Sequence, residues 1–288
     1  MNHPAIRENA VAVVTGAAAG IGFAIAERLC KERMKIVLFD RDEISLANAV
    51  CALRQNYPDV QLTSILGDVT STESLETLYQ TATHFGNVSL VVNNAGIIQG
   101  ANPWQDMAQW RHTMEINFWS VLQIQMLFMN HLIQNAMPAA IVNLGSKEGI
   151  TTPPGNAAYS VSKAGIKVLT EQLAHEIRQL PNNVISAHLL IPGYTYTPMN
   201  FPEMDNFSEK PKAPWNASQV AERLLEGMSQ NEFYIFCEDN EVTKELDQKR
   251  MQWAADDMIK CRPALSRWHA DYQSEFENFI QEKPEQHA

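Results

Sequence analysis

The sequence has few cysteines and no long hydrophobic run. Its four cysteines, at positions 30, 51, 237 and 261, lie far apart and include no C-x-x-C pair. Disulfide frameworks and zinc clusters need closer or more regular spacing, so we expect free thiols and no metal site. No apolar stretch approaches the ~18 residues of a membrane-spanning helix, and the N-terminal MNHPAIRENA lacks the apolar core of a secretion signal. We therefore expect a soluble, cytoplasmic protein.

Clustered positive charge is also missing. The chain carries 22 Lys and Arg against 33 Asp and Glu, a formal charge of −11, and contains no basic run. Nucleic acids and anionic membranes attract basic patches, so neither is an expected partner. A small-molecule partner stays open, because the charge in a cleft can differ from the total. A hydrophobic content of 45% supports a folded core over a disordered chain.

What is present is an alternation of two kinds of segment. Short runs rich in β-branched residues predict strands at 11–15, 35–39, 62–66, 89–93, 139–144, 184–191 and 232–236. Longer amphipathic segments predict helices at 20–32, 42–56, 71–85, 107–135, 156–179 and 217–229. Strict alternation predicts an α/β fold, a doubly wound parallel sheet of about seven strands with helices on both faces. In such sheets, ligands bind beyond the carboxyl ends of the strands.

A glycine-rich turn follows the first expected strand. The segment TGAAAGIG leads from that strand directly into a helix. Gly16 permits a tight turn, while Gly20 and Gly22 let the backbone and the helix N-terminus approach a pyrophosphate. The second strand ends at Asp40, about 20 residues further on, where a carboxylate accepts hydrogen bonds from ribose hydroxyls. That carboxylate repels the 2′-phosphate of NADP, which favours NAD, although Arg41 offsets part of the repulsion. A Rossmann-like dinucleotide-binding fold is the expectation.

The stretch AYSVSKAG places Tyr159 and Lys163 four residues apart on an expected helix. Residues at this spacing share one helical face, so the hydroxyl and the ammonium approach a common point. An unperturbed tyrosine has a pKa near ~10, too high for an efficient base at neutral pH. A nearby ammonium favours the phenolate and lowers that pKa. Taken alone, the pair is also compatible with an ordinary half-exposed helix.

Together these segments resemble the short-chain dehydrogenase/reductase family, over about residues 8 to 236. Seven motifs stand in the family's order, which makes the resemblance specific. They are TGAAAGIG, GDVT (67–70), NNAG (93–96), EINFWS around Asn117, VNLGSKEG around Ser146, YSVSK, and IPGYTYTPM (191–199).

The resemblance implies a catalytic set of four residues. Tyr159 is the acid/base, and Lys163 tunes it while bonding the nicotinamide ribose. Ser146 holds the substrate oxygen and stabilises charge that develops there. Asn117 holds a water that links Lys163 to solvent as a proton relay.

The resemblance also implies how a dinucleotide is held. Asp68 bonds the adenine amine, Val69 packs beside the adenine ring, and Asn94 lies near the cofactor. Ile191 and Thr197 bond the nicotinamide carboxamide. The complete expected cofactor set is Gly16, Gly20, Ile21, Gly22, Asp40, Arg41, Asp68, Val69, Asn94, Gly96, Tyr159, Lys163, Ile191 and Thr197.

Two regions depart from the commonest family pattern. Lys147 and Glu148 follow the serine where small or apolar residues are usual, and their charges either face the substrate or pair on the rim. A proline-rich segment at about 194–216 is an expected lid over the substrate. Its large apolar side chains are Met199, Phe201, Met204, Phe207 and Trp215.

The chain continues beyond the family resemblance. We expect residues 1–240 to form one dinucleotide-binding and catalytic domain, and residues 241–288 to form a helical extension packed on it. One helix is expected at 241–260, and Ser266 is positioned to cap a second helix after Pro263. That helix carries an aromatic stripe, which caps the active site or serves assembly. Its members are Trp268, Tyr272, Phe276 and Phe279 or Ile280.

The two longest expected helices are apolar on more than one face, which predicts a subunit interface. In the resembled family, the equivalent helices form a four-helix contact, so we expect a homo-oligomer, a tetramer before a dimer. The residues concerned are Phe118, Trp119, Leu122, Met126, Met129, Ile166, Leu169 and Leu173.

The functional expectation is an NAD-dependent alcohol dehydrogenase or ketone reductase. Its substrate is expected to be a small apolar or ring-containing secondary alcohol or ketone, because Ile97, Ile98 and Trp104 join the lid near the site. The alternative is a non-catalytic cofactor-binding protein that acts as a redox sensor or scaffold. An intact Ser–Tyr–Lys set argues against that alternative, because such proteins usually lose part of it.

Overall fold

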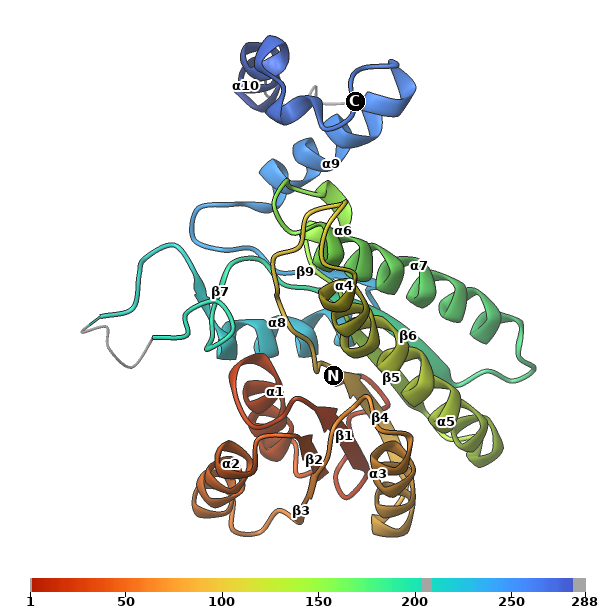
Figure 1. Ribbon diagram of the computed structural model, residues 1–288. Helices are drawn as coiled ribbons and strands as arrows, with labels where there is room; N and C mark the ends of the chain where they lie inside the picture. Colours follow the sequence, from red (N-terminus) through yellow and green to blue (C-terminus); the bar gives the residue numbers. More distant parts are fainter. Residues whose placement is uncertain (1, 204–208, 282–288) are drawn as a thin grey trace.

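The computed structural model describes residues 2–203 and 209–281 (Figure 1). At its centre lies a seven-stranded sheet in the order β3-β2-β1-β4-β5-β6-β9, with every neighbouring pair parallel. The doubly wound parallel sheet predicted from the sequence is confirmed. Its strands are β1 (Val11–Thr15), β2 (Lys35–Asp40), β3 (Leu62–Leu66), β4 (Val88–Asn93), β5 (Ala139–Leu144), β6 (Ile185–Ile191) and β9 (Tyr234–Phe236).

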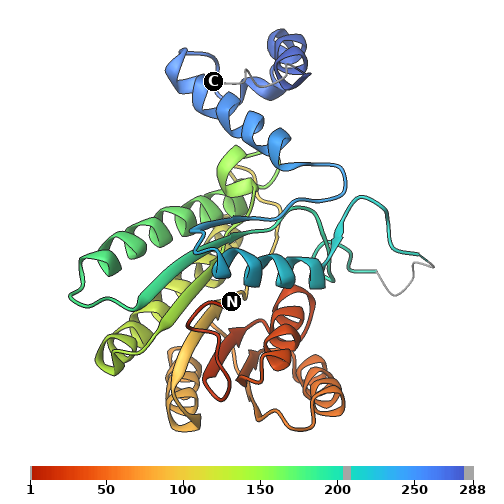
Figure 2. The ribbon, with the colours of Figure 1, turned by 180° about the vertical axis from the view of Figure 1, so that it is seen from behind.

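Helices cover both faces of the sheet (Figures 1 and 2). Alternate side chains of β1 pack into two separate hydrophobic cores, one on each face of the sheet. Ala12 and Val14 lie in the first core, and Val11 and Val13 lie in the second. Strands buried on both faces need continuous apolar runs, which explains the composition of these segments. The first core includes residues of α1 (Gly20–Lys31), α2 (Glu43–Asn56) and α8 (Ala217–Ser229), and the second includes residues of α3 (Thr72–Phe85), α5 (Ser120–Asn135) and α7 (Ala157–Gln179).

Short polar side chains fix where several helices begin. Asp42 caps α2, and its carboxylate accepts a hydrogen bond of 2.9 Å from the backbone amide of Ser45. Ser71 caps α3 in the same way. Asn216 and Gln219 form a reciprocal capping box at the start of α8. These bonds satisfy amides that the first turn of a helix leaves without partners.

The order of the sheet reverses between β1 and β4. Strands β2 and β3 extend to one side of β1, and β4, β5, β6 and β9 extend to the other. A crevice opens beyond the carboxyl ends at such a reversal, because the crossovers leave in opposite directions. The loops after β1, β4 and β5 carry the segments that the sequence singles out, and they meet at this edge.

The helix predicted at 107–135 is present over the same residues, but it is not a regular α-helix throughout. The structure has α4 (Met107–Met114), a π-helical turn η1 (Glu115–Trp119) and then α5. The wide turn contains Asn117, whose side-chain amide forms two hydrogen bonds with the backbone of Ile97. Single π-turns inside α-helices occur frequently at functional sites.

The segment predicted as a lid is closed at its base. Two short strands, β7 (Thr195–Tyr196) and β8 (Trp215–Asn216), pair in parallel with Thr195 opposite Trp215. The ring of Phe201 lies 4.8 Å from that of Tyr196. Two further members of the expected apolar set, Met204 and Phe207, lie outside the described residues.

The C-terminal extension contains α9 (Lys244–Ile259), two 3-10 turns, η3 (Ser266–Trp268) and η4 (Ala270–Tyr272), and α10 (Gln273–Gln281). It stands beyond the end of the sheet and adjoins the short helix α6 (Glu148–Thr151) (Figures 1 and 2). Thr243 caps α9.

The predicted cap at Ser266 is wrong, because the Ser266 side chain is buried and serves a different purpose. Its hydroxyl accepts from the indole of Trp253 at 2.8 Å and donates to Asp257 at 2.6 Å. The aromatic stripe packs against α9, since the ring centres of Phe276 and Phe279 each lie 5.3 Å from the ring centre of Trp253. The extension therefore has a small core of its own. Across the described residues, no helix combines the length and apolar character needed to span a membrane.

Candidate active site

The glycine-rich turn is shaped by backbone that other residues rarely adopt. Gly16 and Gly20 have positive φ angles of 63° and 56°. A Cβ on Gly16 would lie 2.8 Å from the amide nitrogen of Asn94, and one on Gly22 would lie 2.1 Å from the Gly16 carbonyl. Gly22 therefore packs beneath the turn, while Gly16 and Gly20 line the cleft. The start of α1 is left open to an anionic ligand, as a pyrophosphate site requires.

Asn94 joins the glycine turn to the end of β4. Its side-chain amide donates to the carbonyls of Thr15 at 2.8 Å and Gly16 at 2.9 Å. The Thr15 hydroxyl in turn accepts from the backbone amides of Asn94 and Ala95, both at 3.1 Å. The turn is thereby held against the neighbouring strand before any ligand binds.

Asp40 stands at the end of β2 and lines the cleft. One carboxylate oxygen accepts from the backbone amide of Ala18 at 3.0 Å, and the other from that of Asp42 at 3.1 Å. The side chain is thus fixed against the glycine turn, with Arg41 beside it on the exposed rim. An ionised oxygen can accept more than one hydrogen bond, so Asp40 keeps capacity for ribose hydroxyls.

Asp68 lies further along the same edge, with Val69 next to it in the wall of the cleft. Burial raises the pKa of the Asp68 carboxyl, but hydrogen bonds from the Thr70 amide and hydroxyl, both at 2.8 Å, outweigh it and hold the pKa below its usual range. Asp68 is therefore ionised at neutral pH and accepts hydrogen bonds.

Ser146 and Tyr159 meet at the inner end of the cleft. Ser146 follows β5 and Tyr159 lies in the first turns of α7, where it is 7% exposed. Burial raises the pKa of Tyr159 to about 12, a hydrogen bond with Ser146 lowers it, and the nearby charge of Glu148 raises it. The expected lowering by Lys163 is not found, because removal of the phenolate from water dominates. Tyr159 is accordingly protonated at neutral pH.

Lys163 is buried behind Tyr159. Its ammonium donates to the Leu144 carbonyl at 2.8 Å and lies 5.7 Å from the centre of the Tyr159 ring. Burial lowers the pKa of Lys163 to about 8. The shared face that the four-residue spacing predicts is therefore present, in a site that penalises charge on either side chain.

Asn117 lies behind the cleft wall and is fully buried. Its amide oxygen accepts from the Ile97 backbone at 2.8 Å, and its nitrogen donates to the Ile97 carbonyl at 2.9 Å and to Ser162 at 3.1 Å. A Cβ on Gly96 would lie 3.3 Å from the Asn117 oxygen and 3.7 Å from the Lys163 ammonium. The side chain of Asn117 thus holds the loop after β4 in place, and the proton-relay role stays a prediction.

One cleft of about 420 Å³ gathers most of the expected residues. Ile191 is not among them. It lies within β6, and its carbonyl accepts from the amide of Cys237 in the strand pairing with β9. The lining instead continues past Pro192 to Thr195, which was not among the expected residues although the end of the strand at residue 191 was predicted correctly. The expected residues in the lining are Gly16, Gly20, Ile21, Asp40, Arg41, Asp68, Val69, Asn94, Gly96, Ser146, Tyr159, Lys163 and Thr197.

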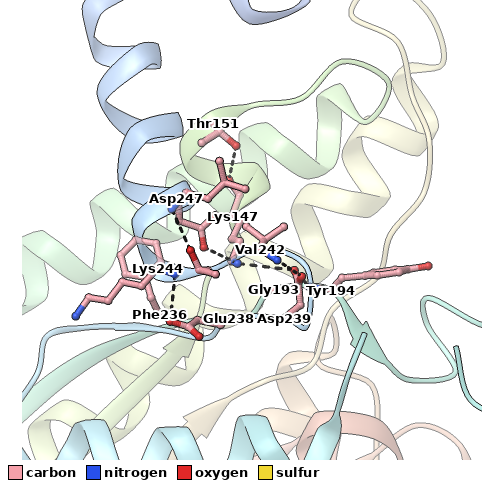
Figure 3. Close-up of polar contacts among 12 residues, drawn as sticks. Lys147, Thr151, Gly193, Tyr194, Phe236, Glu238, Asp239, Val242, Lys244 and Asp247 are labelled. Atoms are coloured by element: carbon pink, nitrogen blue, oxygen red, sulfur yellow. Dashed lines mark hydrogen bonds and ion pairs between the residues drawn. The ribbon is translucent and has the colours of Figure 1, made fainter. Parts of the chain in front are cut away.

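The two charged residues after Ser146 diverge. Glu148 lines the cleft near Tyr159, and burial raises the pKa of its carboxyl. Lys147 instead pairs with Asp247 of the C-terminal extension (Figure 3). Both residues line the cleft, and the ammonium of Lys147 is paired with a carboxylate at its edge.

Comparisons with known proteins agree with this geometry. A family model described as short chain dehydrogenase matches residues 10–206. The 1-deoxy-11-beta-hydroxypentalenate dehydrogenase of Streptomyces avermitilis is 28% identical over 246 residues, which are 84% of this chain and 89% of the relative. A short-chain dehydrogenase/reductase from Burkholderia phymatum, solved in complex with NAD, superposes with a TM-score of 0.79 at 27% identity, covering 88% of this chain and 96% of that one. Actinorhodin polyketide ketoreductase, solved with NADPH, gives 0.68 at 25% identity, covering 78% and 94%.

The fold and these matches define an NAD(P)-dependent oxidoreductase that acts on CH–OH groups. Within that class, the chain belongs to the short-chain dehydrogenase/reductase family.

Proposed function

We propose that this protein is an NAD(H)-preferring dehydrogenase that interconverts a secondary alcohol and its ketone. The observation that carries the proposal is the meeting of Ser146, Tyr159 and Lys163 at the inner end of a cleft whose other end is the glycine turn. Ketone reduction needs a proton donor at oxygen beside the hydride donor, and the protonated Tyr159 in this arrangement supplies it.

The residues present fit a dinucleotide. A Cβ on Gly20 would lie 3.3 Å from the Thr197 side chain, so only a glycine leaves the passage over α1 open. In the proposal, Gly16 and Gly20 hold the pyrophosphate, Asp40 the adenosine ribose, and Asp68 the adenine amine. The bound dinucleotide supplies or accepts the hydride.

The chain's own residues manage the proton. In ketone reduction, Tyr159 donates its hydroxyl proton to the substrate oxygen, which Ser146 holds by a hydrogen bond. Lys163, close behind, stabilises the phenolate that remains and returns a proton to it. In alcohol oxidation the same transfers run in reverse.

The substrate is proposed to be apolar and ring-containing. Ile97, Ile98 and Met199 line the cleft, which offers apolar walls around the reacting carbon. Trp104 does not contribute, because it is 78% exposed and lies outside the lining. A panel of cyclic and linear secondary alcohols and ketones with NAD(H) and NADP(H), followed by absorbance of the reduced nicotinamide, tests the proposal. Turnover of primary alcohols alone would contradict it.

We expect a tetramer in solution. Four large apolar side chains on η1, α5 and α7 are 44% to 65% exposed. They are Trp119 in η1, Met126 in α5, and Val161 and Val168 in α7. Two of the residues first assigned to this face, Ile166 and Leu173, are buried inside the chain because they face the sheet. Exposed apolar surface on two neighbouring helices usually contacts a partner.

Light scattering at micromolar concentration is expected to give the mass of four 32.4 kDa chains. Val168→Glu should lower that mass, because it places a charge in the contact. Val184→Glu is the matched control, since Val184 is similarly exposed but lies beyond the C-terminus of α7. A single-chain mass for the unaltered protein would contradict the prediction.

A further inference from the structure

Lys147, the residue next to Ser146, reaches out of the cleft to the C-terminal extension (Figure 3). Its ammonium lies 2.5 Å from a carboxylate oxygen of Asp247 on α9 and 3.9 Å from one of Asp239. The side chains of Lys147, Asp247 and Asp239 are only 18%, 8% and 7% exposed. A cation in the active-site loop is thus held by two carboxylates from a part of the chain about 100 residues away.

Asp239 connects the same cluster to the loop after β6. The carboxylate oxygen that faces Lys147 also accepts from the backbone amide of Tyr194 at 3.4 Å. Its other oxygen accepts from the amide of Val242 at 2.8 Å, which fixes the turn into α9. A Cβ on Gly193 would lie 3.0 Å from the Lys147 ammonium. The loop after β5, the loop after β6 and the extension therefore meet at one point.

The Lys147 backbone transmits this contact to the catalytic residues. Its carbonyl accepts from the amides of Ile150 and Thr151, at 3.1 and 3.0 Å, and so starts α6. A Cβ on Gly149 would lie 2.5 Å from the carbonyl carbon of Lys163, so α6 is packed directly on α7. A shift of Lys147 must move Ser146 on one side and α6 on the other.

The far partner is braced by the extension's own core. Trp253, 2% exposed, packs between Phe276 and the guanidinium of Arg262, which lies 3.7 Å from the centre of the indole. Lys249 donates to the carbonyls of Phe279 and Ile280 at 3.0 and 2.9 Å, tying α10 to α9. Asp247 is thus presented by a rigid unit, not by a loose tail.

Stability alone does not explain the pair. Burial raises the pKa of the Asp247 carboxyl, which Lys147 opposes, so the carboxylate is costly to ionise where it lies. Buried ion pairs often contribute no more to stability than apolar residues of the same size, and their best-attested use is to fix one arrangement over others.

We propose that the C-terminal extension is a positioning element of the active site: Asp247 of the extension, together with Asp239 just before it, holds Lys147 and thereby fixes the hydroxyl of Ser146 against Tyr159. Lys147 is a positioning residue that acts through Ser146 and does not touch the substrate. This inference rests on the proposed function, since it concerns the same serine and tyrosine.

The first test removes the charge of Lys147 and keeps its length, as Lys147→Met. We expect kcat to fall about tenfold to a hundredfold, because a displacement of about 1 Å at a reacting group has effects of that size. The Kd for NADH, measured by fluorescence, should stay within about twofold, because the glycine turn and Asp40 are untouched. Lys260→Met is the matched control, since Lys260 pairs with Asp256 on the same helix and is far more exposed.

Leaving Asp247 buried without its partner could unfold the extension, so the double variant Lys147→Met with Asp247→Asn removes both charges. It should fold with a melting temperature near that of the parent and show the same loss of kcat. A folded double variant with parental kcat would overturn the proposal.

A second test asks whether Lys147 acts through the serine. In a Ser146→Ala background, Lys147→Met should cost less than about twofold in kcat, because effects of residues that act as a unit do not multiply. An equal loss in both backgrounds would refute the positioning role. Tyr159→Phe distinguishes a failure of the positioning role from a failure of the proposed function. Full turnover in that variant would reject the acid/base role of Tyr159, whereas the effect of Lys147→Met on kcat would be unaffected by that result.

Discussion

Tyr159→Phe is expected to abolish turnover while leaving cofactor binding close to normal. The substitution removes only the hydroxyl that carries the proton, in a side chain that is 7% exposed and packed in place. Loss of a positioned acid/base lowers rates by about 10² to 10⁴. The glycine turn, Asp40 and Asp68 are all distant from that hydroxyl along the cleft and should hold NADH as before. Steady-state kcat and NADH fluorescence titration measure the two halves of this prediction.

Tyr79→Phe serves as the matched control, because Tyr79 lies on α3 at the edge of the second core, against Phe128. It should leave kcat unchanged. A folded Tyr159→Phe protein that turns over at the parental rate would exclude Tyr159 as the proton donor.

Removing the charge of Asp40 is expected to narrow the preference for NAD(H) over NADP(H). In the proposed cofactor arrangement, the Asp40 carboxylate, which accepts a hydrogen bond from the Ala18 amide at 3.0 Å, faces the 2′-substituent of the adenosine ribose. A like charge brought against it costs several kcal/mol, and each 1.4 kcal/mol is a factor of ten. Asp40→Asn removes the charge and keeps an acceptor for one of the two backbone amides, so kcat/KM with NADP(H) should rise about tenfold or more relative to NAD(H).

Asp40→Ser extends the comparison, because it also loses the hydrogen bond to the glycine turn and should weaken binding of both cofactors. Asp59→Ser is the control, since Asp59 is exposed and lies in the turn before β3. If the unaltered protein uses NADP(H) as well as or better than NAD(H), the assignment of Asp40 is wrong.

The parts of this molecule that follow from short-range spacing were predictable from its sequence. The parallel sheet was predictable because apolar runs alternate with amphipathic segments, and topology then places the ends of β1, β2, β4 and β5 at one edge. The four-residue interval between Tyr159 and Lys163 specifies a shared helical face in the same way. These features depend on the spacing of residues that are close together in the sequence, and such spacing can be seen in the sequence itself.

Features that depend on distant contacts or on the degree of burial were not predictable. The ion pair between Lys147 and Asp247 joins the loop after β5 to helix α9, about 100 residues further along the chain, and no local pattern specifies it. Burial reverses the expected direction of the Tyr159 pKa, since the sequence does not show how completely water is excluded. Ile191 lies in the sheet as the last residue of β6, and the strand pattern does not specify which residues of the following loop line the cleft.

The π-helical turn at Glu115–Trp119 changes the directions in which the side chains before and after it point around the helix axis. Each residue of an α-helix advances the side-chain direction by about 100°, as 3.6 residues per turn require. Deleting one residue from this turn would let α4 and α5 run on as one regular helix. Either Asn117 would then rotate away from Ile97, or every residue of α5 after it would rotate off the second core. The extra residue in the wide turn changes the direction in which the following side chains point. One continuous helix can therefore direct Asn117 toward the backbone of Ile97 and still direct the apolar side chains of α5 into the second core.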